Sequence, residues 1–270
     1  MRSSRSTVGV LFLLIGMLLP SLAPAQQIGG GPVQRAPVFG ETGMVHERAG
    51  FVVGAAYGRA KKSAEFFDIT DSAVLVGGSF GLTDWLTVGA TVPYLTSSFQ
   101  LQGEPEDEVS GIGNAALHTR VRVFGAGDEG VRAAVLASAV FPTAADELAP
   151  VNSFLVALGG GLSYAADPVS FHAAAEVELA SDENIQETIN YSASFAFRPA
   201  DQIVLSGEFV GVDPRGGEES EGSDAAGYGG VGARVFLGSD RNLYIDGGAL
   251  FGLTDEAFDN LWSVGVGFAR

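Results

Sequence analysis

Hydrophobic and polar residues alternate strictly in the stretch VSFHAAAEVEL, residues 169–179. Val169, Phe171 and Val177 fall on odd positions, whereas His172 and Glu176 fall on even ones. Because successive side chains of a β-strand point to opposite faces, the pattern predicts a strand with one apolar and one polar face. Such a strand suits a soluble sandwich, and it also suits a membrane barrel whose apolar face meets lipid and whose polar face lines a lumen.

The same alternation recurs along the chain and predicts about twelve strands, each about ten residues long. They lie near residues 50–60, 71–80, 85–98, 113–124, 131–143, 153–164, 169–181, 187–198, 203–213, 226–237, 243–253 and 260–270.

The connectors between these segments fall into two classes. One class is short and rich in Gly, Pro, Asn and Asp, as tight hairpins require; it comprises residues 81–84, 125–130, 165–168, 199–202 and 238–242. The other class is longer and acidic, and comprises residues 102–110, 144–151, 181–186 and 213–224. Short turns at one end and long loops at the other are typical of outer-membrane barrels. We therefore predict an all-β fold, a transmembrane antiparallel up-and-down β-barrel over residues 50–270.

The apolar faces of the predicted strands carry almost no charge, which suits lipid better than water. A lipocalin-like soluble barrel reverses the pattern, with its apolar residues inside. We expect Phe171, Val177, Ile189, Tyr191 and Phe195 to face lipid. Aromatic residues also collect near strand ends, where interfacial girdles lie; they are Tyr57, Trp85, Tyr94, Phe124, Phe141, Tyr164, Tyr244 and Trp262.

The N-terminal residues have the pattern of an export signal. Arg2 and Arg5 precede an apolar run at 8–19 and the small-residue sequence at 23–25, which predicts a secretory signal peptide over residues 1–25. Residues 26–49 are expected to form an N-terminal periplasmic segment. No later stretch is apolar enough for a transmembrane helix. The chain has no cysteine, and its formal net charge of -17 argues against a nucleic-acid partner.

Charged and imidazole side chains fall on the polar faces of the predicted strands. The simplest interpretation is a network of acids and arginines lining a lumen, because a charge inside a strand must face water or a partner. The lumen-lining candidates are His118, Arg120, Arg122, Arg132, His172, Glu176, Glu178, Arg198, Glu208, Arg234 and Asp246.

Catalysis is the rival interpretation of the histidines. Ser170 and His172 lie two apart on one strand, so their Cα atoms are about 7 Å apart, a loose separation for a nucleophile and its base. His118 with a nearby acid is a second catalytic candidate. No stretch resembles the motifs of barrel phospholipases, and we expect no enzyme activity, no catalytic residue and no cofactor.

Two further patterns carry little chemistry. GYGGVG, residues 227–232, matches the G-x-G-x-x-G spacing of dinucleotide sites, but that motif requires a strand before it and a helix after it, and here an alternating strand follows. The acidic runs at 104–108, 181–184 and 218–224 lack the spacing of a calcium loop. We interpret them as solvated loops, with loose bridging of cations or lipopolysaccharide as the alternative, and predict no specific metal site.

Two short stretches resemble a known family. They are GLTDWLTVGATVPYL, residues 81–95, and SGIGNAALHTRVRVF, residues 110–124, with AVFPTA at 139–144 as a third element. They resemble outer-membrane barrels grouped with the meta-pathway of phenol degradation, which are described as transporters. The resemblance implies an outer-membrane channel or transporter; its motifs mark turns rather than a ligand site. Outer-membrane barrels usually end on an aromatic residue. The C-terminus departs from this rule, because Ala269 and Arg270 follow the last aromatic residue.

The sequence thus predicts a porin-like channel in a Gram-negative outer membrane for passive passage of small solutes, including small aromatic or hydrophobic compounds. The alternatives are a barrel enzyme of lipase or protease type and a structural or surface-interaction barrel. The expected partners are outer-membrane lipid and lipopolysaccharide, the barrel-assembly machinery and a small-molecule solute.

Overall fold

The computed structural model describes residues 44–64, 66–102, 105–127, 129–144, 148, 153–181, 187–215 and 225–270. The predicted signal peptide, most of the predicted N-terminal segment and much of the acidic runs lie outside the described residues.

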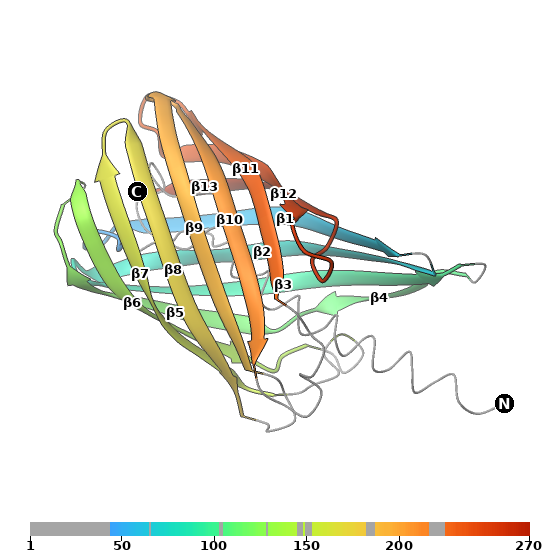
Figure 1. Cartoon of the computed structure of the whole chain (residues 1–270). Helices are drawn as coiled ribbons and strands as arrows, with labels where there is room; N and C mark the ends of the chain where they lie inside the picture. Colours follow the sequence, from blue (N-terminus) through green and yellow to red (C-terminus); the bar gives the residue numbers. More distant parts are fainter. Residues whose placement is uncertain are drawn as a thin grey trace.

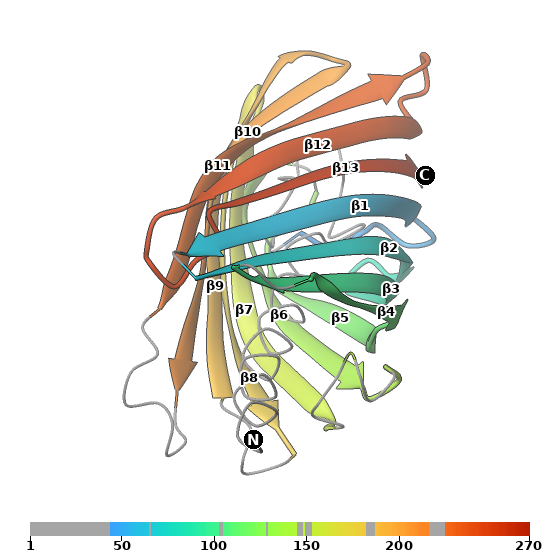
Figure 2. The ribbon, with the colours of Figure 1, turned by 90° about the vertical axis from the view of Figure 1, so that its right-hand side faces the viewer.

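Antiparallel strands run round a closed barrel (Figures 1 and 2). The strands are β1 (Phe51–Ala64), β2 (Phe67–Thr83), β3 (Leu86–Leu101), β4 (Asp107–Ile112), β5 (Ala115–Phe124), β6 (Gly130–Phe141), β7 (Leu155–Ala166), β8 (Val169–Ala180), β9 (Glu187–Ala200), β10 (Ile203–Arg215), β11 (Ala226–Leu237), β12 (Leu243–Gly252) and β13 (Asn260–Ala269). Each strand pairs with its neighbour in sequence, except that β4 and β5 both pair with β3 and not with each other, and β1 pairs with β13 to close the barrel. At the seam, the amide of Phe51 donates to the carbonyl of Arg270 at 2.7 Å, and the amide of Arg270 donates back at 2.9 Å.

The barrel has twelve strand positions, as predicted, because β4 and β5 share one of them. β5 pairs with residues 86–91 of β3, and β4 pairs with residues 94–99. The break falls at Gly113, where an added Cβ would lie 2.7 Å from Leu95 and 2.9 Å from Pro93. The prediction of an irregular loop over 102–110 is therefore wrong at its end, since β4 begins at Asp107.

The two ends of the barrel differ, as the connectors predicted. Short turns join β2 to β3, β7 to β8 and β9 to β10 at one end of the barrel. Strand β13 ends at this same end, whereas β1 ends at the opposite one. The β1–β2 and β3–β4 hairpins project beyond the rest of the barrel (Figure 1). By the rule for outer-membrane barrels, the short turns mark the periplasmic end.

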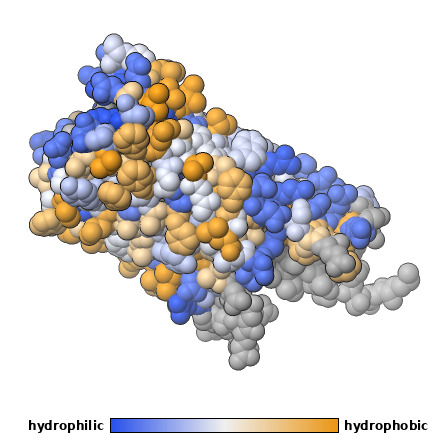
Figure 3. Space-filling view, turned by 45° about the horizontal axis from the view of Figure 1, so that its top comes forward, coloured by the Kyte–Doolittle hydropathy of each residue, from blue (hydrophilic) through white to orange (hydrophobic). Residues whose placement is uncertain are grey.

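The outer face of the barrel is apolar and the inner face mixed. Phe171, Val177 and Phe195 are exposed on the outside, whereas His172 and Glu178 of the same sheet region are buried. Ile189 and Tyr191 share the outer face and are half-buried. Figure 3 shows apolar residues in a band over the barrel and hydrophilic residues gathered toward the end where the long hairpins project. This surface and the closed antiparallel sheet make the chain an outer-membrane β-barrel.

Among the described residues, no helix is long and apolar enough to cross a membrane.

The residues before β1 turn into the barrel. Met44, Val45 and His46 are buried. Val45 packs with Ala134 of β6 and Ala174 of β8. The His46 ring hydrogen-bonds the Ser79 hydroxyl of β2 at 2.7 Å. This part of the predicted N-terminal segment therefore crosses the periplasmic half of the interior.

Candidate functional site: the barrel interior

All of the predicted lumen-lining residues fall at inward-facing positions of their strands. Arg120, Arg132, His172, Glu178, Glu208 and Arg234 are buried, and His118, Arg122, Glu176, Arg198 and Asp246 are half-buried. Within their strands, the arginines lie toward the periplasmic end, whereas Glu176 and Glu178 lie in the extracellular half of β8. Asp246 lies at the level of Arg234, its register partner on β11, so charges of both signs occur toward the periplasmic end.

The best-defined charge pair joins β11 to β12. Arg234 and Asp246 are direct register partners, and the Arg234 guanidinium donates twice to the same Asp246 carboxylate oxygen, at 2.6 and 3.0 Å. The guanidinium also lies 4.9 Å from the centre of the Tyr244 ring, a cation–π contact. Because Tyr244 is 4% exposed on the inner face, its prediction as a girdle residue is wrong.

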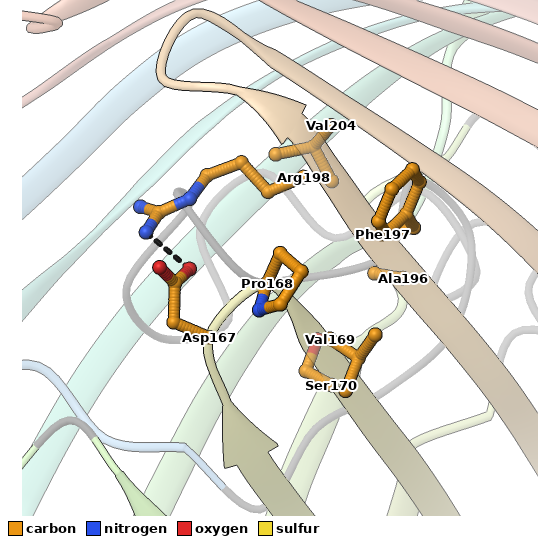
Figure 4. A pocket seen from close by; sticks show the side chains of 8 residues that line it. All are labelled: Asp167, Pro168, Val169, Ser170, Ala196, Phe197, Arg198 and Val204. Carbon is orange, nitrogen blue, oxygen red and sulfur yellow. Dashed lines mark hydrogen bonds and ion pairs between the residues drawn. The ribbon is translucent and has the colours of Figure 1, made fainter.

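Arg198 does not join the acids with which the sequence grouped it. Its guanidinium instead pairs with Asp167, in the turn between β7 and β8. Figure 4 shows this ion pair at one side of a small recess in which Pro168 and Val204 also lie. Arg198 thus belongs to the periplasmic rim, where it ties two neighbouring hairpins together.

His172 lies between two hydroxyls. Its Nε2 is 3.0 Å from the Ser170 hydroxyl oxygen, and its Nδ1 is 2.9 Å from that of Ser163. The separation of Ser170 from His172 is therefore not loose, because both side chains lean along the strand on one face. However, Ser170 is 3% exposed, and a nucleophile must reach its substrate. The other ring nitrogen of His172 contacts the Ser163 hydroxyl, whereas in a catalytic triad that nitrogen contacts a carboxylate.

Two of the other predicted polar residues, Glu208 and His118, also form hydrogen bonds within the wall. The Ser206 hydroxyl donates to Glu208 at 2.5 Å, and His118 hydrogen-bonds the Thr91 hydroxyl at 2.9 Å. Glu178 lies opposite Thr188 on β9. These hydrogen bonds hold the side chains of Glu208 and His118 against the inner face of the wall.

Part of the interior is a buried apolar cluster, which the alternation did not predict. A buried cluster spans the inner faces of β1–β3 and β10–β13 and includes part of the connector before β13. It consists of Ala60, Ile69, Phe99, Val210, Ala226, Tyr228, Leu250, Ala257, Phe258 and Leu261. The Phe258 amide donates to the Tyr228 hydroxyl at 3.1 Å. The extracellular half therefore combines an apolar wall with the acids of β8.

Sequence reasoning also missed two inward polar residues. His46 lies outside every predicted strand, so no alternation marked it. Asp71 is 1% exposed and lies opposite Ser97 of β3. The spacing of Asp71 from Ile69 and Leu75, which also face inward, could have identified it as an inner residue. The predicted strand began at residue 71, however, and neither of its faces was assigned to the interior.

The glycine motif lies within a strand, where a close backbone contact accounts for Gly230. Residues 227–232 lie inside β11, so they form no strand-to-helix turn. At Gly230, a Cβ would lie 2.0 Å from the Ala249 carbonyl oxygen, so close backbone approach accounts for this glycine. Within the described residues, no group of three or more His, Cys, Asp or Glu is placed to hold a metal.

Comparison with known proteins agrees on the fold. No protein-family model and no curated protein sequence matches the chain. Among solved structures, it is similar to a COG4313 outer membrane channel from Pseudomonas putida F1, with a TM-score of 0.64 and 11% identity over 83% of this chain and 96% of that one. It also resembles the translocator domain of the autotransporter NalP from Neisseria meningitidis (TM-score 0.56, 14% identity, 81% and 88% covered). A third similar structure is the KdgM porin in complex with disordered oligogalacturonate (TM-score 0.52, 6% identity, 81% and 99% covered).

Proposed function

We propose that this barrel is an outer-membrane channel for passive passage of small solutes, among them small aromatic or hydrophobic compounds. The observation that carries the proposal is the interior itself, where charged residues of both signs and an apolar cluster line one closed barrel. The folds of an outer membrane channel and a porin support the general role.

The solute class follows from the apolar part of the interior. Binding sites for small organic molecules are mostly apolar, with a few fixed polar groups that orient the ligand. Ile69, Phe99 and Leu250 belong to the buried apolar cluster on one side of the interior, and Glu176 and Glu178 lie on β8. The resemblance to barrels grouped with phenol degradation points to the same class of solute.

We expect a narrow interior. Twelve strands leave more room than a side-chain-filled eight-stranded barrel and less than a sixteen-stranded porin. Val45 and His46 take part of that room at the periplasmic end. Passage then requires movement of these residues or a solute small enough to pass them.

The test is single-channel recording of the full mature chain in planar bilayers, together with uptake of phenol into liposomes that carry it. We expect discrete conductance steps and phenol entry faster than in protein-free liposomes. Absence of both would refute the channel.

A barrel enzyme is the rival function, and the 3.0 Å contact between Ser170 and His172 is the observation in its favour. Hydrolysis of a lipid or peptide ester by the purified barrel, lost on Ser170→Ala, would favour it. A barrel with neither conductance nor hydrolysis would favour the structural or surface-interaction role.

A further inference from the structure

Two cations lie on the outer surface of β1, near its extracellular end. Arg59 and Lys61 are two residues apart and therefore project from the same face, with Cα atoms about 7 Å apart. Arg59 is exposed, and Lys61 has a side chain that is 43% exposed. In a chain with a net charge of -17, this pair is a local exception.

The pair lies directly above the apolar band. Tyr57, the next outer residue toward the periplasm, packs against Trp262 of β13 in a tilted arrangement, with ring centroids 5.3 Å apart. Trp262 is 40% exposed and is the register partner of Arg59. Aromatic rings of this kind mark the boundary between hydrocarbon and headgroups. On β2, the outer face changes at the same level from Val74 to Ser72.

The charge of these cations is only partly balanced within the protein. Arg59 has no ion pair in the described part of the chain, where its register partners are Ser72 and Trp262. Lys61 has a single acidic partner, Asp68, at a long and exposed distance of 3.9 Å. An arginine in this setting is suited to bind a phosphate through two parallel hydrogen bonds.

We propose that Arg59 and Lys61 bind a phosphate of the lipid A part of lipopolysaccharide, with Tyr57 and Trp262 against the upper acyl chains. Lipid A is the occupant that combines the required features, because it places phosphate at the headgroup level of the outer leaflet and acyl chains directly below. The lipid site lies outside the barrel and is independent of the proposed channel.

The experiment is native mass spectrometry of the purified full chain in detergent, titrated with bisphosphoryl lipid A. The double variant Arg59→Gln/Lys61→Gln should bind at least about tenfold more weakly, as expected for loss of charge-assisted hydrogen bonds. Asp68→Asn should bind more tightly, because it removes the acid beside Lys61. Arg215→Gln is the matched control, since it removes the same charge from β10, where Arg215 already pairs with Asp213; it should bind as the parent does.

Opposite shifts in Arg59→Gln and Asp68→Asn would support the site. Equal binding by the parent and Arg59→Gln, or shifts of both single variants in the same direction, would overturn it. If fully dephosphorylated lipid A binds as well as the bisphosphoryl form, the site recognises acyl chains alone. If millimolar inorganic phosphate alone occupies the site, it is a free-anion site. Either result refutes the lipid A assignment. If the double variant does not fold, the single variants Arg59→Gln and Asp68→Asn still test the site. All of the variants should have the conductance of the parent if the channel proposal holds.

Discussion

Placing a charge in the middle of the outer face tests the orientation of the whole barrel. Ala173 is exposed on the outer face of β8, four residues after Val169 at the periplasmic end. At about 3.3 Å per residue and a tilt of about 40°, it lies roughly 10 Å above that end, near the middle of an apolar band about 25 Å tall. Ala173→Arg should therefore lower the free energy of unfolding by about 2–4 kcal/mol. Because alanine has little side chain to lose, the cost reports the charge alone.

The assay is equilibrium unfolding by urea in phospholipid vesicles, followed by the fluorescence of Trp85 and Trp262. Ala173→Leu is the matched control and should be about as stable as the parent, because an apolar side chain there meets lipid. Phe195→Arg lies nearer the periplasmic boundary, so the charge should cost less. It also breaks the ring contact of Phe195 with Phe171, whose centroids are 5.1 Å apart, which adds about 0.5–1.5 kcal/mol. If Ala173→Arg is as stable as Ala173→Leu, the face assigned to lipid is wrong.

Three further outcomes follow from the interior. Asp246→Ala should destabilise the barrel by about 3 kcal/mol in the same urea assay, because it leaves Arg234 buried without its carboxylate, whereas Arg234→Met/Asp246→Leu should cost much less; equal losses would show that the pair is solvated. Deleting residues 26–46 should raise single-channel conductance, because Val45 and His46 then leave the interior; an unchanged conductance would mean that they do not limit passage. The purified parent should hydrolyse esters no faster than background, and Ser170→Ala should leave that rate unchanged. An activity of the parent that is lost on Ser170→Ala would support the enzyme.

Much of the barrel could be predicted because its strands are amphipathic in a simple way. The apolar residues of β8 and β9 had to face lipid, and the turns carried Gly, Pro and Asp, so strand number, order and face followed from local pattern. The strand ends were less predictable. Strand β1 extends to Ala64 and β2 begins at Phe67, both beyond the predicted limits. Above the membrane the outer residues are polar, so polar and apolar residues no longer alternate along the strand.

The interior was less predictable because its contacts are between distant residues. The partner of Arg198 is Asp167 in a neighbouring turn, and the position of Tyr244 depends on Arg234 and Phe236 across the strand pair. The apolar cluster also escaped notice, since Ile69 and Leu250 have the same residue types as a lipid-facing surface. Nothing in the alternation places Val45 against β6 and β8, because the residues before a barrel have no strand period.

The ion preference of the interior tests the central claim most directly. Glu176 and Glu178 lie on the inner face of β8, and field lines concentrate in a charged aqueous path with low-dielectric walls. Glu176→Gln/Glu178→Gln keeps side-chain volume and removes two negative charges. The measurement is the reversal potential of the reconstituted parent and double variant across a salt gradient. We predict a shift toward anion preference in the variant, reduced at high salt by screening. A conducting parent whose reversal potential is unchanged by the double substitution would contradict the account.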